Sequence, residues 1–172
     1  MNYSIVIPAF NESKAITEQL EEIKKYIHKN KINAELIVID DGSTDNTYSM
    51  LKKYKYKNLI IKKNMSNLGY GKSIKLGVDL AKNENIIIID CDMSYPFSEI
   101  NQLKTYYEKG YDMVIAERKN LFEHDGFFKN LLRFVFKLIV NYISGNKVSD
   151  PNSGFRIFKK SIFIKHKNII SD

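Results

Sequence analysis

The chain has 172 residues, of which 44% are hydrophobic and 27% charged, and its formal net charge is +7. This length supports one hydrophobic core, and no linker-like tract divides it, so we expect one continuously folded domain. The single cysteine excludes an internal disulfide, and the first residues lack the pattern of a signal peptide, which favours a cytoplasmic compartment. Scattered lysines supply most of the positive charge, which is typical of a solvated surface. Attraction to anionic lipid or phosphate is the alternative, and we expect no nucleic-acid partner.

Strands and helices alternate along most of the chain. Short runs rich in Ile and Val predict strands at residues 3–8, 35–40, 58–63, 85–90 and 111–116. Amphipathic stretches between them predict helices at residues 16–27, 43–54, 71–82 and 97–110. We expect Pro8 to stop the first strand, Ser43 or Thr44 to cap the second helix and Gly110 to end the fourth. Near-continuous apolar strands joined by crossover helices are typical of an α/β fold whose parallel sheet is covered on both faces.

Acidic residues stand where two of these strands end. Asp40 and Asp41 follow the second predicted strand, and Asp90 and Asp92 follow the fourth. Ligands of such sheets bind outside the carboxyl ends of the strands, so both pairs should reach one crevice. Residues i and i+2 of an extended segment point the same way, so Asp90 and Asp92 should project together while Cys91 turns toward the core. Paired carboxylates repel unless a cation separates them, which predicts a Mg²⁺ or Mn²⁺ site; simple strand termination or helix capping is the alternative.

The segment NLGYGKS, residues 67–73, contains glycines that allow the backbone to approach a ligand near a helix N-terminus. It is not a P-loop, because Ser66 stands where that motif requires a glycine. The dinucleotide fingerprint also fails for want of its third glycine. We assign Gly69 and Lys72 to nucleotide binding, with a plain loop as the alternative.

Several segments, in order and spacing, resemble the large inverting glycosyltransferase family typified by dolichol-phosphate mannose synthase. They are IVIPAFNE (5–12), VIDDGSTDNT (38–47), NLGYGKS (67–73), DCDMSYP (90–96) and SDPNSGFRIFKK (149–160). The resemblance spans about residues 3–160 and implies a single-domain glycosyltransferase A-type, Rossmann-like fold that binds a nucleotide-sugar and a divalent metal. Phe10 departs from a frequent tyrosine of the family, and Ser73 and Cys91 depart from frequent alanines.

The resemblance also implies roles for individual residues. The residues expected around the nucleotide-sugar are Pro8, Phe10, Glu12, Asp40, Asp41, Gly69, Lys72 and Asp90, with Asp90 and Asp92 at the metal and diphosphate. The chemistry of the reaction, apart from the resemblance, gives the catalytic set Asp92, Asp150 and Arg156, because a nucleotide-sugar leaves negative charge on its diphosphate. Asp150 is expected to act as a general base or to orient the acceptor. The guanidinium fork of Arg156 suits the acceptor phosphate; a surface ion pair is the alternative for Arg156.

The stretch 127–145 is apolar apart from one polar stripe. Its members recur every four residues and are Lys129, Arg133, Lys137 and Asn141. An apolar run of about 17 residues with three basic side chains is a poor transmembrane span, which needs about 20. The alternatives are a core helix with one wet stripe, or a helix lying in a membrane interface with Arg133 toward the acceptor phosphate.

We therefore expect a catalytic domain over 1–172, with a nucleotide-sugar part at 1–116 and an acceptor-side part at 117–172. Because relatives in the family commonly continue, the abrupt end at Asp172 is expected to truncate it. The expected activity is metal-dependent transfer of a hexose from a GDP- or UDP-linked sugar to a polyprenyl phosphate. The enzyme should associate peripherally with the cytosolic face of a membrane. Transfer to a saccharide and nucleotide-sugar binding without catalysis are the alternatives, whereas the missing glycine fingerprint disfavours an oxidoreductase.

Overall fold

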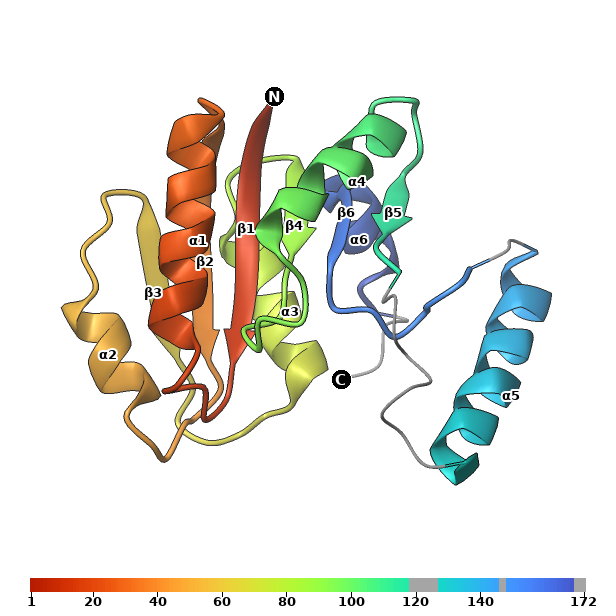
Figure 1. The fold of residues 1–172 in the computed structure, drawn as a ribbon, viewed down its shortest axis with the longest axis horizontal. Helices are drawn as coiled ribbons and strands as arrows, with labels where there is room; N and C mark the ends of the chain where they lie inside the picture. Colours follow the sequence, from red (N-terminus) through yellow and green to blue (C-terminus); the bar gives the residue numbers. More distant parts are fainter. Residues whose placement is uncertain (118–126, 146–147, 169–172) are drawn as a thin grey trace.

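The computed structural model describes residues 1–117, 127–145 and 148–168, and its centre is a six-stranded sheet (Figure 1). The strand order is β3-β2-β1-β4-β6-β5. The strands are β1 (Asn2–Ala9), β2 (Asn33–Asp40), β3 (Leu59–Lys63), β4 (Asn85–Ile88), β5 (Met113–Ile115) and β6 (Arg156–Lys159). The first four are parallel, whereas β6 runs antiparallel to both β4 and β5. The predicted α/β fold with a mostly parallel sheet is confirmed.

Helices cover both faces of this sheet (Figure 1). One layer contains α1 (Ile16–Lys29), α2 (Thr47–Lys53), η1 (Phe97–Glu99) and α4 (Ile100–Tyr107), and the other contains α3 (Tyr70–Leu80) and α6 (Lys160–His166). Side chains of the strands alternate between the layers: Ile5 packs in the cluster under α1, and Val6 packs in the cluster under α3. The predicted apolar face of α1 is confirmed, because it buries Ile16, Leu20, Ile23 and Ile27.

The strand β1 continues through Pro8, so the prediction that this proline stops the strand is wrong. Backbone groups of residues two apart in a strand face the same neighbour, and the carbonyl of Val6 accepts a hydrogen bond from Ile89 N–H at 3.2 Å. Pro8 therefore faces the β4 side, beyond the last ladder pair between Val6 and Ile88. Its missing N–H removes no ladder hydrogen bond at that position.

Sequence analysis missed the strand β6, whose residues were noted only for their family resemblance. It lies between β4 and β5, where Arg156 pairs with Ile88 on one side and Ile115 on the other. The predicted strand at 111–116 therefore becomes the edge strand β5 and is not a neighbour of β4. Residues 117–172 thus supply an internal strand of the same sheet that residues 1–116 build.

The helix α5 (Phe127–Ser144) stands apart from the sheet (Figure 1). Many of its described apolar side chains are exposed, with exposed fractions of 43–90%. They are Leu132, Phe134, Val135, Phe136, Leu138, Ile139, Tyr142 and Ile143. On the predicted polar stripe, Lys137 and Asn141 are half-buried, and Asn141 Oδ1 accepts a hydrogen bond from Val148 N–H at 2.8 Å. The side chains of Lys129 and Arg133 lie outside the described residues. The structure therefore does not support the alternative of a core helix.

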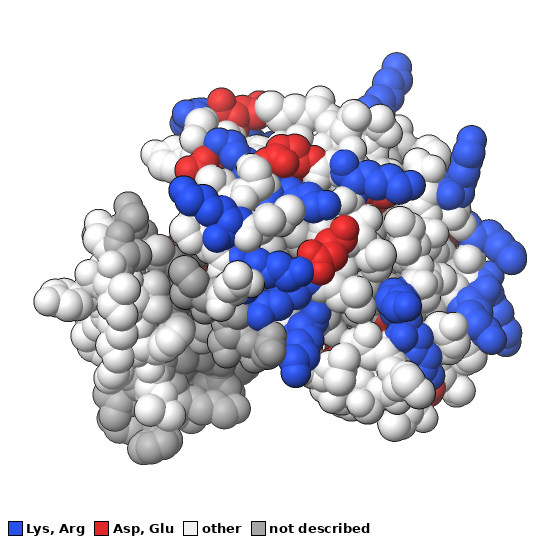
Figure 2. All heavy atoms as spheres, turned by 180° about the vertical axis from the view of Figure 1, so that it is seen from behind, with Lys and Arg blue, Asp and Glu red and all other residues white. Residues whose placement is uncertain are grey.

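Among the described helices, none combines the length and apolar character needed to cross a membrane. Figure 2 shows Lys and Arg side chains spread over the body of the domain, with acidic side chains between them. This distribution agrees with the expected solvated surface.

Candidate active site

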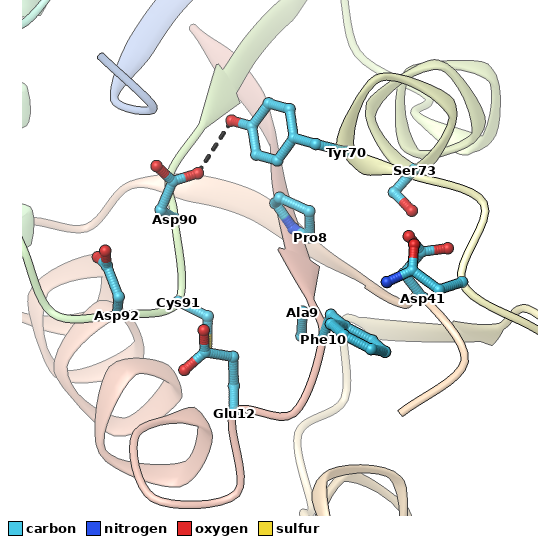
Figure 3. A pocket seen from close by; sticks show the side chains of 11 residues that line it. Pro8, Ala9, Phe10, Glu12, Asp41, Tyr70, Ser73, Asp90, Cys91 and Asp92 are labelled. Atoms are coloured by element: carbon cyan, nitrogen blue, oxygen red, sulfur yellow. Dashed lines mark hydrogen bonds between the residues drawn. The ribbon is translucent and has the colours of Figure 1, made fainter. Parts of the chain in front are cut away.

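A pocket of about 330 Å³ opens at the carboxyl ends of β1, β2 and β4, beside the first turns of α3 (Figure 3). The chain runs from β1 to β2 and β3 on one side and returns to β4 on the other side of β1, so this pocket lies at the switch point of the sheet. Its lining residues are Pro8, Ala9, Phe10, Glu12, Asp41, Asn67, Tyr70, Ser73, Asp90, Cys91 and Asp92. The sheet thus brings together most of the predicted nucleotide-sugar residues.

Three carboxylates gather at one end of the pocket, from Glu12, Asp90 and Asp92 (Figure 3). The pKa of Glu12 is raised, mainly by its partial burial and to a smaller extent by the negative charges of Asp92, Asp45 and Asp90. Glu12, which was expected around the nucleotide-sugar, lines the pocket at its acidic end. Between the two aspartates, Cys91 is buried in the core as predicted, and this burial raises the pKa of its thiol.

The carboxylate of Asp90 is held between two distant segments. On one side, the hydroxyl of Tyr70 donates to Asp90 Oδ1 at 2.9 Å (Figure 3), and burial and the Asp90 charge raise the pKa of that hydroxyl. On the other side lies Gly154, where a Cβ would stand 1.6 Å from Asp90 Oδ2. Only a glycine leaves room for the carboxylate in this position.

The turn that carries Gly154 is fixed by the buried side chain of Ser153. Its hydroxyl shares a hydrogen bond of 2.8 Å with the hydroxyl of Tyr95 and accepts another from Phe155 N–H at 3.2 Å. Sequence analysis assigned no role to Tyr70 or Gly154. The glycine of the SGFR segment was the available signal, but the sequence does not reveal that this segment returns to Asp90.

Asp41 lies at the opposite end of the pocket, near Phe10 and Ser73 (Figure 3). Its Oδ1 accepts hydrogen bonds from Asn64 Nδ2 at 2.7 Å and Leu68 N–H at 3.0 Å, and its Oδ2 accepts one from Gly69 N–H at 2.9 Å. Gly69 is therefore placed to orient Asp41 and does not itself line the pocket.

The backbone beside Asp41 is equally constrained. Gly42 has a φ of +73°, and a Cβ there would lie 2.4 Å from the backbone carbon of Ser66. The glycine therefore allows the loop after β2 to contact the loop before α3, and these two loops carry Asp41 and Asn67 into the wall of the pocket.

Two other predicted residues lie away from the pocket. Asp40 is fully buried; its Oδ1 accepts a hydrogen bond from Ser43 N–H at 3.2 Å, and Lys63 Nζ lies 3.9 Å from its Oδ2. The prediction that both acids of this pair reach the crevice is wrong for Asp40, because neighbouring residues of an extended chain point in opposite directions. Lys72 is exposed and is not among the lining residues.

Hydrogen bonds join the loop after β1 to the loop after β2 beside the acidic end of the pocket. Asp45 Oδ1 accepts hydrogen bonds from the N–H (2.9 Å) and hydroxyl (2.5 Å) of Thr47, and its Oδ2 accepts one from Ser13 N–H at 3.1 Å. Burial opposes ionisation, but these hydrogen bonds dominate and lower the pKa of Asp45 to about 2.

Neither Ser43 nor Thr44 caps α2, which starts after Asn46 without a side-chain cap, so that prediction is wrong.

The two residues predicted to serve the acceptor, Arg156 and Asp150, lie in different places. Arg156 is half-buried on β6; its Nη2 donates to the carbonyl of Ser153, and its charge acts to lower the pKa of Tyr70 against the larger effects that raise it. Arg156 therefore lies near the acidic end. Asp150 is buried and lines a second cavity, of about 490 Å³, together with Glu117. Asp150 is not among the residues that line the first pocket.

Comparison with known proteins identifies the family. Residues 4–168 match the family model described as Glycosyl transferase family 2. The chain belongs to glycosyl transferase family 2. The resemblance inferred from the sequence motifs is thereby confirmed, and the pocket lies in the part of the chain that this match covers.

Relatives in glycosyl transferase family 2 include polyprenyl-phosphate sugar transferases. The chain is 33% identical to an uncharacterized protein of Methanocaldococcus jannaschii, over 98% of this chain and 68% of that protein. It is 25% identical to a dolichyl-phosphate beta-glucosyltransferase of Dictyostelium discoideum (91% and 54% covered). It is 28% identical to an undecaprenyl-phosphate 4-deoxy-4-formamido-L-arabinose transferase of Proteus mirabilis (92% and 49% covered). The chain thus spans about half the length of these two named transferases.

Solved structures show the same fold. Mannosyl-3-phosphoglycerate synthase from Rubrobacter xylanophilus superposes with a TM-score of 0.75 at 15% identity, over 95% of this chain and 54% of that one. Glucosyl-3-phosphoglycerate synthase from Mycobacterium tuberculosis, crystallised with Mn²⁺, uridine diphosphate and phosphoglyceric acid, gives a TM-score of 0.71 at 19% identity, over 94% and 57%.

Proposed function

We propose that this chain is the catalytic domain of a metal-dependent inverting glycosyltransferase that moves a hexose from a GDP- or UDP-linked sugar to a polyprenyl phosphate. The observation that carries the proposal is the two-ended pocket, with Asp41 and Phe10 at one end and the acidic cluster of Glu12, Asp90 and Asp92 at the other. The named lipid-phosphate transferases among its relatives support the acceptor class.

In this proposal the nucleobase lies against Phe10 and Asp41, and the diphosphate lies toward the acidic end. Carboxylate oxygens are the ligands that Mg²⁺ and Mn²⁺ prefer, so Asp90 and Asp92 fit a divalent cation by their chemistry. When bound, such an ion neutralises the charge that develops on the diphosphate leaving group. Within the described residues, no three His, Cys, Asp or Glu side chains are arranged to hold a metal ion by themselves. In this proposal the substrate or water supplies the remaining ligands.

The residues around the acids have supporting roles in this scheme. Tyr70 and Gly154 hold the Asp90 carboxylate in one orientation. Arg156 contributes a positive charge near the same end, where a phosphate is expected. A polyprenyl phosphate is largely ionised at neutral pH because its second pKa is about 6, and its attack therefore needs no strong base. Asp150 then orients the acceptor from the second cavity.

The activity is tested by incubating the purified protein with UDP- and GDP-sugars, Mn²⁺ and either polyprenyl phosphate or a saccharide. Lipid-linked product is the expected result, whereas sugar-linked product, or nucleotide binding without turnover, would overturn the proposed acceptor or activity. Asp92→Asn should lower turnover by roughly 100-fold and weaken Mn²⁺ binding, because the amide keeps the shape but not the charge. Asp79→Asn, at an exposed ion pair with Lys167, is the matched control and should leave both unchanged.

We also propose that α5 mediates peripheral membrane association, because its exposed apolar side chains have no cover among the described residues. The protein should float with anionic vesicles, and added salt should weaken this binding if basic residues of the helix contact headgroups. Leu138→Asp should abolish flotation without unfolding the domain, since Leu138 is 53% exposed. Ile164→Asp on α6, where the isoleucine is 51% exposed, is the control and should still float. No flotation of the wild type at any salt concentration would refute the proposal.

A further inference from the structure

The hydroxyl of Ser73 is a buried polar group that projects into the pocket. Ser73 lies on α3, is fully buried and lines the pocket, and its Oγ has no hydrogen-bond partner within the described residues. Figure 3 shows this hydroxyl directed toward the end of the pocket that holds Asp41. Buried side-chain polar atoms in folded proteins nearly always have a partner, and their exceptions call for an explanation.

The usual internal partner of a helical serine does not explain this hydroxyl. Serine side chains within helices often bond to the carbonyl four residues earlier. Here the carbonyl of Gly69 accepts the backbone N–H of Ser73 at 3.1 Å, but it does not accept the hydroxyl. The hydroxyl therefore points to a partner that enters the pocket.

Asp41 supplies the complementary group beside it. Within the described residues, Asp41 Oδ1 accepts two hydrogen bonds and Oδ2 accepts one. A carboxylate oxygen can accept two, so Oδ2 can take one more N–H from a ligand. The hydroxyl of Ser73 and the carboxylate of Asp41 thus present a donor and an acceptor at the same end of the pocket.

We infer that Ser73 is a nucleobase-binding residue whose hydroxyl donates a hydrogen bond to an acceptor atom of the base while Asp41 accepts from an adjacent N–H. This inference rests on the proposed function, because it requires a nucleoside diphosphate in the pocket. The hydrogen-bonding edges of uracil and guanine both carry a carbonyl oxygen next to a ring N–H, which this pair of groups matches. The ring of Phe10, 42% exposed at the same end, offers an apolar surface for the base.

Ser73→Ala tests the inference by titration calorimetry with UDP and GDP and by thermal unfolding without ligand. We expect affinity for the preferred nucleotide to fall about 3- to 10-fold, as for the loss of one hydrogen bond. The unliganded variant should melt no lower than the wild type, because the substitution removes a buried hydroxyl that lacks a protein partner. A purely structural role would produce the opposite pattern, with a lower melting temperature and unchanged affinity.

Ser49→Ala is the matched control, because that exposed hydroxyl donates to the carbonyl of Asn46 on α2, and its loss should leave nucleotide affinity unchanged. If the wild type binds UDP or GDP and Ser73→Ala binds equally well, the inference on Ser73 fails while the proposed function stands. If the wild type binds neither nucleotide, the proposed function fails and the inference fails with it.

Discussion

Replacing Gly154 with alanine tests whether the turn before β6 holds Asp90 in place. The added Cβ would lie 1.6 Å from Asp90 Oδ2, whereas ordinary contact begins at 3.4 Å, so the oxygen must withdraw by about 1.8 Å. That movement disrupts the 2.9 Å hydrogen bond from Tyr70. Because a displacement of about 1 Å at a catalytic group can cost roughly 100-fold in rate, we expect kcat to fall by about that factor.

The assay combines steady-state turnover with Mn²⁺ binding followed by electron paramagnetic resonance and with thermal unfolding. Gly110→Ala is the control: nothing lies within 4 Å of the added Cβ, but the φ of +101° strains alanine, so this variant should lose stability and keep its turnover. Wild-type turnover and Mn²⁺ binding in Gly154→Ala would refute the reasoning. If Gly154→Ala unfolds, adding Asp90→Ala should restore folding by removing the overlapping carboxylate; no rescue would also count against it.

Three further substitutions test the surroundings of the acids. Because the pKa of Glu12 is raised, the folded state favours the protonated carboxyl, and its contribution to the free energy of unfolding is present below the ordinary pKa of 4.5 and is lost as the pH rises. Glu12→Gln, which cannot ionise, should therefore raise the melting temperature at pH 7 but not below about pH 4.5. Asp45 has a pKa lowered from 3.8 to about 2, so its contribution is present above pH 3.8 and is lost as the pH falls through about 2. Asp45→Ala should cost about 1 kcal/mol at pH 7, measured by urea denaturation, with a smaller difference at pH 2. Tyr70→Phe removes the hydroxyl that orients Asp90, and it should lower kcat several-fold with little change in nucleotide affinity; an unchanged kcat would argue against that role.

Much of the fold follows from local patterns in the sequence. The Ile- and Val-rich strands and the apolar face of α1 were predicted because burial on both faces of a sheet, or on one face of a helix, leaves a periodic signal in neighbouring residues. The acids after β2 and β4 indicated the pocket because parallel strands present their carboxyl ends at one edge. This argument placed Asp41, Asp90 and Asp92 correctly in the lining of one pocket.

Other features depend on contacts between distant segments and have no local signal. Both Asp40 and Asp41 follow the same apolar run, but the direction in which β2 presents its residues buries the first and directs the second into the pocket. The insertion of β6 between β4 and β5 brings Gly154 against Asp90, 64 positions earlier in the printed sequence. The sequence by itself therefore determined the α/β class and the acids at the strand ends. Only the tertiary structure decided which acids meet, what holds Asp90 and that the apolar residues of α5 face outward, because each depends on which segments pack together.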